Sequence, residues 1–179
     1  MTQVANTYAQ ALYDLAKDEG VDKQILNELD VLGQAFEQEP GFLRLLAAPN
    51  LPKTERCGIL DESFRNQVHV YVLNFLKILT ERGYARQFAD CCKAYRDHYN
   101  ADHGIVTVQA VTAVPLTGEQ SARLADKLTK ITGKTIELTN RIDPAVLGGV
   151  RLDYDGKRVD GTVKNRLDTV RDLLKNTVL

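Results

Sequence analysis

The period of the hydrophobic pattern changes near residue 104, and this change limits the possible folds more than any other feature of the sequence. Before it, apolar residues recur at the three- and four-residue spacing of amphipathic helices. After it, Val106, Val108 and Ala110 alternate with polar residues, as in a half-buried strand. One layer of structure cannot bury both patterns. The sequence therefore predicts two domains, an all-α domain over 1–104 and a small α+β domain over 105–179.

The helical spacing before residue 104 falls into about six segments and predicts a six-helix bundle. Asp22 is expected to cap the second helix, and Gly83 stands where a left-handed residue would end the fifth. The fifth segment, 68–83, is apolar on most faces, so it lies at the centre of the bundle or presents a second apolar face. The expected apolar stripe of the first helix is Val4, Tyr8, Leu12 and Leu15, with Ala5, Ala9 and Ala16 beside it.

The pattern after residue 104 predicts a strand, a helix, a second strand over 135–142, two further strands in a hairpin, and a last helix. Thr117 followed by Gln120 is a capping box, and the helix that it starts is expected to end at Gly133. Asp155-Gly156 is a hairpin turn signal, and Asp160 suits the N-cap of the last helix. The apolar stripe of that last helix is Val163, Leu167, Val170 and Leu174.

The glycine-rich stretch over 146–167 invites comparison with a phosphate-binding loop. Such a loop must follow a strand and open a helix, so that backbone N–H groups converge on the anion. Here a strand-like run follows Gly148-Gly149, and the Gly-Lys-Thr at Gly133 stands between a helix and a strand, in the reverse order. The glycines are therefore expected to turn the chain, with no cofactor bound.

Composition and reactive residues exclude several functions. The net charge of -1 disfavours a general nucleic-acid or anionic-membrane binder. Residues 1–104 carry 11 basic and 15 acidic residues, whereas 105–179 carry 12 and 9, so the two domains have opposite net charge. Three cysteines, two of them adjacent, favour free thiols in a reducing compartment. No signal peptide, membrane span, metal-ligand spacing or nucleophile motif is recognised, so we expect no catalytic, cofactor-binding or metal residues.

Two segments carry a resemblance to a known family. The stretch "IDPAVLGGVRLDYDGKRVDGTVKNRLDTVRDLL" has the Gly-Gly, strand, hairpin and Asp-Gly-Thr-Val order, and "YAQALYDLA" has the Tyr-Ala-x-Ala-Leu opening. The chain resembles the bacterial delta subunit of F-type ATP synthase, of the oligomycin-sensitivity-conferring protein family. Tyr84 stands where arginine is frequent in the family, and Thr162 where serine is frequent.

The resemblance implies a non-catalytic stator subunit that links the catalytic alpha/beta head to the peripheral stalk, so that proton-driven rotation is coupled to ATP synthesis. One copy per complex would lie at the cytoplasmic face of the cell membrane, without inserting into it. The helical domain would bind the head, receiving the N-terminal segment of an alpha subunit between its first and fifth helices. The second domain would bind the C-terminal ends of the b subunits in the stalk.

Nine residues are candidates for these contacts. Those expected to line the alpha-subunit site are Tyr8, Ala11, Leu12, Leu15, Leu73 and Ile78, although core residues would read alike. Those expected at the rim of the stalk contact are Arg166, Arg171 and Lys175. Two rival functions remain open, an RNA-binding helical bundle of the antitermination type and a small enzyme. The acidic front half and the lack of a recognisable site disfavour them.

Overall fold

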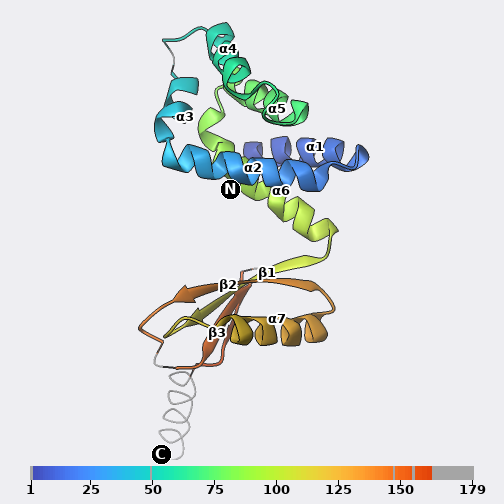
Figure 1. Ribbon diagram of the computed structural model, residues 1–179, viewed down its shortest axis with the longest axis vertical. Coiled ribbons are helices and arrows are strands. Elements are labelled where there is room, and N and C mark those ends of the chain that lie inside the picture. The colour runs from blue at the N-terminus through green and yellow to red at the C-terminus, as the bar shows by residue number, and fades with distance from the viewer. Residues whose placement is uncertain (1, 49, 147, 155, 163–179) are drawn as a thin grey trace, which may run out of the picture. The chain divides into compact units, whose positions relative to one another are not determined.

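The computed structural model describes residues 2–48, 50–146, 148–154 and 156–162 (Figure 1). The chain divides into two units, with the boundary between Asp102 and His103. The first unit is helix-rich, and the second contains a four-stranded mixed sheet with one described helix.

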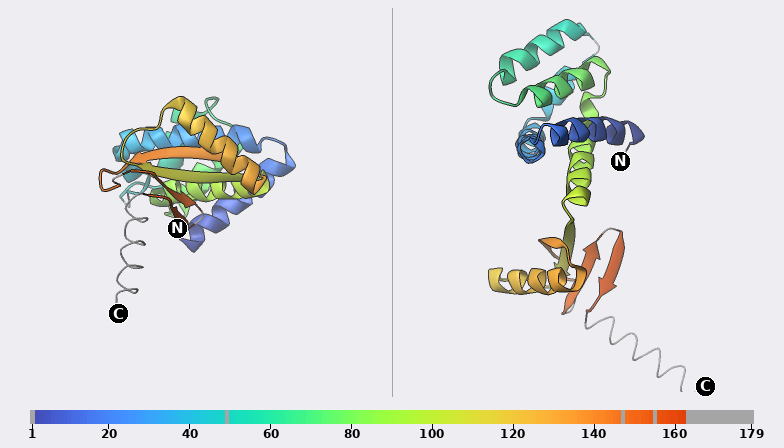
Figure 2. Two further views of the ribbon diagram at one scale, coloured as in Figure 1. Left: turned by 90° about the horizontal axis from the view of Figure 1, so that it is seen from below. Right: turned by 90° about the vertical axis from the view of Figure 1, so that its right-hand side faces the viewer.

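Seven α-helices lie in the described residues, and all but α7 belong to the first unit. The helices of the first unit are α1 (Gln3–Asp18), α2 (Asp22–Gln38), α3 (Pro40–Leu46), α4 (Lys53–Phe64), α5 (Val70–Glu81), the short 3₁₀ helix η1 (Ala85–Gln87) and α6 (Phe88–Asp102). Helix α6 packs against both α1 and α2, and α4 pairs with α5 (Figures 1 and 2).

The side of α1 that faces the core differs from the expected stripe. Ala5, Ala9 and Ala16 are completely buried, whereas Leu15 is 42% exposed and Tyr8 is half-buried. Small side chains let two helix backbones approach closely, so these alanines belong to the buried side of α1 together with Leu12 and Tyr13. Of the expected stripe of α1, Leu12 is buried and Leu15 is exposed, whereas the three alanines beside the stripe are all buried.

The ends of the first unit's helices follow local sequence with one exception. Gly83 has φ +78°, and its N–H and that of Tyr84 donate to the Thr80 and Leu79 carbonyls at 3.2 and 2.7 Å. This double bond satisfies two carbonyls at the end of α5 and confirms the predicted glycine stop. The predicted cap at Asp22 is wrong. The N-cap residue of α2 is Val21, and Asp22 is its first helical residue, where a negative charge favours the helix dipole.

The second unit contains β1 (Ile105–Thr112), α7 (Gly118–Thr132), β2 (Thr135–Ile142), β3 (Val150–Tyr154) and β4 (Lys157–Asp160). The strand order is β2-β1-β3-β4, with β1 parallel to β2 and antiparallel to β3. Helix α7 connects the two parallel strands and packs against β2. Strand β1 is central, and its Val108, Ala110 and Val111 are buried.

The predicted capping box, glycine helix end and hairpin of this unit are confirmed. Thr117 and Gln120 form the reciprocal capping box of α7, and Gly133 ends that helix in the left-handed conformation. Gly156, with φ +71°, lies between β3 and β4, which pair as the expected hairpin. Asp160 is the last residue of β4, and its carboxylate accepts the Thr162 N–H at 2.9 Å. The predicted last helix lies outside the described residues.

Replacing Thr117 by alanine tests the capping box. The substitution removes the acceptor for the Gln120 N–H, so the second unit should lose about 1 kcal/mol of unfolding free energy. NMR signals of the second unit during urea titration would measure this loss. Thr129→Ala, at an exposed interior position of α7, is the matched control and should not destabilise the unit. Equal stability of the two variants would contradict the role of the cap.

Candidate functional site

The expected alpha-subunit site maps onto α1 and α5, which contact each other in the first unit. Ala11, Leu15 and Ile78 are exposed, and Tyr8 is half-buried. Leu12 and Leu73 are only 6% and 8% exposed, so they belong to the core. We use the name α1–α5 surface for the accessible residues of this site together with Val70, which is also exposed on α5. Its members are Tyr8, Ala11, Leu15, Val70 and Ile78.

Val70 belongs to this surface although it was not among the expected site residues. It is 55% exposed and lies two helical turns before Ile78, on the same side of α5. That spacing was visible in the sequence, but both sides of the segment are apolar, so the pattern could not tell the exposed side from the buried one. The contact between Tyr84 and Tyr8 was not predicted from the sequence either. Its ring lies 5.9 Å from the Tyr8 ring, at an interplanar angle of 53°.

Two side-chain bonds fix the start of α5. The His69 Nδ1 atom accepts the Tyr71 N–H at 3.3 Å, and the Glu28 carboxylate of α2 accepts the His69 N–H at 2.6 Å. These bonds satisfy N–H groups at a helix start, where the helix itself supplies no acceptor. The side of α5 that carries Val70 and Ile78 is thereby held relative to α2.

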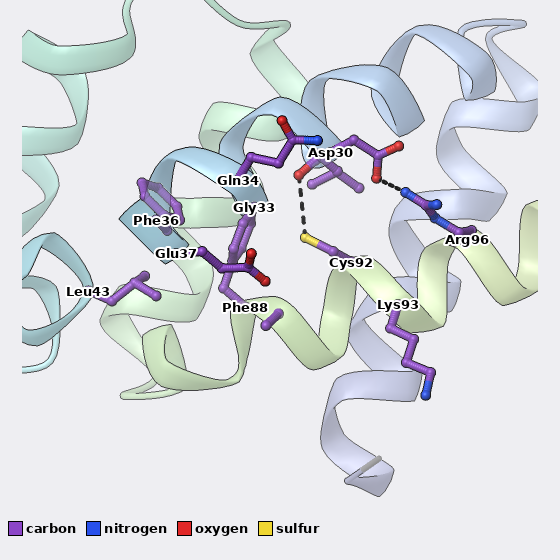
Figure 3. Close-up of a pocket in the computed structure, with 12 residues that line it drawn as sticks. Asp30, Gly33, Gln34, Phe36, Glu37, Leu43, Phe88, Cys92, Lys93 and Arg96 are labelled. Atoms are coloured by element: carbon purple, nitrogen blue, oxygen red, sulfur yellow. Dashed lines mark hydrogen bonds and ion pairs between the residues drawn. The ribbon is translucent and has the colours of Figure 1, made fainter. Parts of the chain in front are cut away.

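A pocket between α2 and α6 was not predicted from the sequence (Figure 3). Its apolar lining includes Leu29, Phe36, Leu43 and Phe88. An ion pair between Asp30 and Arg96 joins the two helices at its edge, and the Cys92 thiol contacts the Leu29 carbonyl, with 3.7 Å between Sγ and O (Figure 3). The lining residues come from separate segments, so no local motif could have indicated the pocket.

The thiols of α6 are poorly suited to nucleophilic chemistry. Burial raises the pKa of Cys91 and of Cys92 to about 12, so almost no thiolate is present at neutral pH.

His98 stacks on Tyr13, and its Nε2 lies 3.1 Å from the Asn6 Oδ1. Within the described residues, no group of three His, Cys, Asp or Glu side chains could hold a metal ion. Nor does any described helix combine the length and apolar character of a membrane span.

The stalk candidates Arg166, Arg171 and Lys175 lie outside the described residues. Three described charges of the second unit, Arg151, Asp153 and Arg158, form a small network on the β3–β4 hairpin. Asp153 accepts from Arg158 Nε at 2.8 Å and lies 3.4 Å from Arg151 Nε. The hydrogen bond from Arg158 is the main reason that the pKa of Asp153 is lowered.

A helix-rich unit with exposed apolar side chains, joined to a small α+β unit, places the chain in the class of helix-rich proteins with two units. The match to known proteins narrows this class. Residues 4–174 match the family model for the ATP synthase delta (OSCP) subunit, and the chain belongs to this family. It is a non-catalytic stator subunit of ATP synthase.

Individual relatives agree over nearly the whole length. The chain is 34% identical to "ATP synthase subunit delta" of Alkaliphilus oremlandii over 176 residues, covering 98% of each chain. It is also 34% identical to the protein of that name from Lactobacillus delbrueckii subsp. bulgaricus, covering 96% of each. A chain of the Toxoplasma gondii mitochondrial ATP synthase hexamer shares the fold, with a TM-score of 0.73 at 17% identity, covering 97% of this chain and 98% of that one. Nothing in these similarities supports the RNA-binding alternative.

Thiol alkylation tests the burial of Cys92. With its pKa near 12, the thiolate fraction at pH 8 is about a thousandfold below that of an unperturbed thiol, so iodoacetamide should modify it very slowly. Because folding raises this pKa, the thiol's contribution to stability is present below about pH 8.5 and is lost as the pH rises toward 12. Mass spectrometry of Cys92 against a model thiol peptide measures the rate. Alkylation at the model rate in the folded chain would contradict the assignment.

Proposed function

We propose that α1–α6 act as one six-helix bundle, the head-binding domain over 1–104, and that the α1–α5 surface receives the N-terminal segment of an alpha subunit. The exposed apolar side chains of this surface carry the proposal. An amphipathic helix that docks here would cover Leu15, Val70 and Ile78, which the first unit leaves partly open to water. Removing apolar area from water contributes roughly 25 cal/mol per Å², so a few such side chains can supply useful binding energy.

The α1–α5 surface is already formed before the alpha-subunit segment binds to it. Leu12 and Leu73 are buried in the core, and the bonds of Glu28 and His69 hold the start of α5. A preformed surface loses little conformational freedom when it binds, which favours affinity. A stator subunit needs this property, because it must remain attached to the head while the rotor exerts torque.

The second domain, 105–179, is the proposed binding site for the C-terminal ends of the b subunits. Its net positive charge supports this, and Arg166, Arg171 and Lys175 are the candidate rim charges. Rim charges act mainly on the association rate and on the register of the complex. In this arrangement one copy per complex lies peripherally, at the cytoplasmic face of the cell membrane, and links the head to the stalk.

Tyr8→Asp tests the alpha-subunit site. A carboxylate at this half-buried position on the apolar surface would lose its hydration on binding, so affinity for a synthetic alpha-subunit N-terminal peptide should fall at least about tenfold. Isothermal titration calorimetry measures the affinity, and circular dichroism checks that the domain stays folded. Gln10→Asp adds the same charge at an exposed position on another side of α1 and is the matched control. Equal affinities for the two variants would remove the site.

Charge reversal at Arg166, Arg171 and Lys175 tests the stalk contact. If these side chains are rim charges, the triple glutamate variant should bind a peptide from the C-terminal end of a b subunit with an association rate about tenfold lower at low salt, and less so at high salt. Surface plasmon resonance separates the association rate from the dissociation rate. Arg123, Lys127 and Lys130, exposed on α7, give a triple variant of equal charge as the control. Indistinguishable association by the two triple variants would contradict the assignment.

A further inference from the structure

Strand β2 forms one edge of the four-stranded sheet. Among the described strands it pairs only with β1, so its other side meets no strand. It is eight residues long, against four for β4 at the opposite edge, and it contains no proline. An edge of this length offers a row of backbone N–H and C=O groups to another extended chain.

The hydrogen bonds to β1 show which backbone groups of β2 point to the open side. The Thr135 N–H donates to the Gly104 carbonyl, and the Asp143 N–H donates to the Thr112 carbonyl. The odd-numbered residues of this stretch therefore direct their backbone groups toward β1. Because these groups alternate in direction along a strand, those of the even-numbered residues point to the open side. The outward-directed residues are Ile136, Leu138, Asn140 and Ile142.

The sequence of β2 is complementary to itself in one antiparallel register, with Thr139 of one copy opposite Thr139 of a second. Glu137 of each copy then lies opposite Arg141 of the other, and two-fold symmetry produces this pair twice. Both side chains are exposed. The two positions form a non-hydrogen-bonded pair, in which opposite side chains come closest, so their unlike charges attract. Arg141 lies 3.7 Å from Asp143 through one nitrogen, and a guanidinium has further donors to offer.

The same register also matches the outward-directed residues. Ile136 lies opposite Ile142 of the second copy, and Leu138 lies opposite Asn140, and each pair can exchange two backbone hydrogen bonds. Ile142 is 51% exposed, so its contact with Ile136 removes apolar area from water. Asn140 brings no unpartnered polar group to the contact, because its side-chain amide already makes three hydrogen bonds within the second unit.

Other registers lose this complementarity. A shift by one residue places apolar side chains of one copy opposite polar ones on the wrong face. A pairing centred on Leu138 sets Glu137 against Thr139, so both ion pairs are lost. A pairing centred on Asn140 sets Glu137 against Asp143 of the second copy, where like charges repel. The register centred on Thr139 is therefore the favoured one.

Helix α7 supports pairing at the same edge. It packs against β2, yet none of its residues is buried, and Ile131 is 80% exposed. The two-fold axis of an antiparallel pair stands perpendicular to the joined sheet, so the α7 helices of both copies lie on the same face. Since each helix packs on the edge strand of its own sheet, the two become neighbours and can shield apolar area that one copy leaves exposed.

We propose that the free subunit pairs with a second copy of itself through the open edge of β2, in the antiparallel register centred on Thr139. The pairing joins the two sheets into one and forms a weak, concentration-dependent dimer, because a single strand pairing is smaller than a standard stable interface. It uses neither the α1–α5 surface nor the three stalk candidates, so it does not depend on the proposed partner sites. Because one copy per complex is the proposed arrangement, the dimer is a state of the subunit outside the complex.

Charge reversal in the full chain tests the proposal. Sedimentation equilibrium should show a concentration-dependent dimer, and Glu137→Arg or Arg141→Glu should weaken it at least about tenfold, since each replaces two attractions by two repulsions. The double variant that carries both reversals should restore the dimer, because it rebuilds both ion pairs. Glu62→Arg, the same reversal at an exposed position of α4, is the matched control and should leave association unchanged.

Hydrogen–deuterium exchange and cross-linking locate the contact. The amides of the four outward-directed residues of β2 should become more protected as the protein concentration rises. On oxidation, Thr139→Cys should form a disulfide between residues 139 of two copies, whereas Thr135→Cys should not link to itself.

Three results would overturn the proposal. They are a chain that stays monomeric at every concentration, a dimer that the double charge reversal does not restore, and a dimer in which exchange at β2 is unchanged. Protection of the outward-directed amides already in the monomer would also count against it, because residues 163–179 would then cover the edge. If Arg141→Glu fails to fold, Glu137→Arg and the double variant decide the question.

Discussion

The contact between α1 and α6 is the interaction on which the rest of the first unit depends. Ala5, Ala9 and Ala16 give α1 a buried side of small residues, and Ala94 and Tyr95 of α6 are equally buried. Small side chains of this kind let two helix backbones approach closely. The large apolar residues of α1 divide between the core and the surface: Leu12 and Tyr13 are buried, whereas Leu15 is exposed and Tyr8 is half-buried. The side of α1 that faces the core therefore also determines which apolar side chains remain on the surface proposed to bind the alpha subunit.

Polar contacts then fix how α1 and α6 lie relative to each other. Asn6 meets His98, and Tyr13 and Lys17 meet Asp102, so α1 holds α6 along its second half. A hydrophobic contact is non-directional, whereas a hydrogen bond fixes the position of its partner. For a stator subunit this distinction matters, because force must pass from one end of the chain to the other. Apolar burial holds the helices together, and the bonds define how they lie.

The sequence predicted most reliably those features that depend on neighbouring residues. The capping box of Thr117 and Gln120, the glycine end of α5 at Gly83 and the hairpin turn at Gly156 each involve a few consecutive residues and a fixed backbone geometry. The prediction for Asp22 was wrong by one position, because the N-cap residue is Val21, whose side chain makes no cap bond and gives no local signal. The family resemblance also came from local order along the chain, and it gave the function before any contact was known.

Features that join distant residues could not be predicted in the same way. The pocket between α2 and α6, the bond from Glu28 to the start of α5 and the bond from Tyr13 to Asp102 each link segments that are dozens of residues apart. The site residues show the same limit. Leu12 and Leu15 read alike in the pattern, yet one is buried and the other exposed.

The sequence by itself determined the change from helices to strands, the local stops and caps, and the membership of the delta subunit family. Only the tertiary structure decided which side of each helix faces inward. The physical reason is that periodicity marks an apolar stripe but does not specify its partner, and small residues such as Ala9 become core through close approach of another helix.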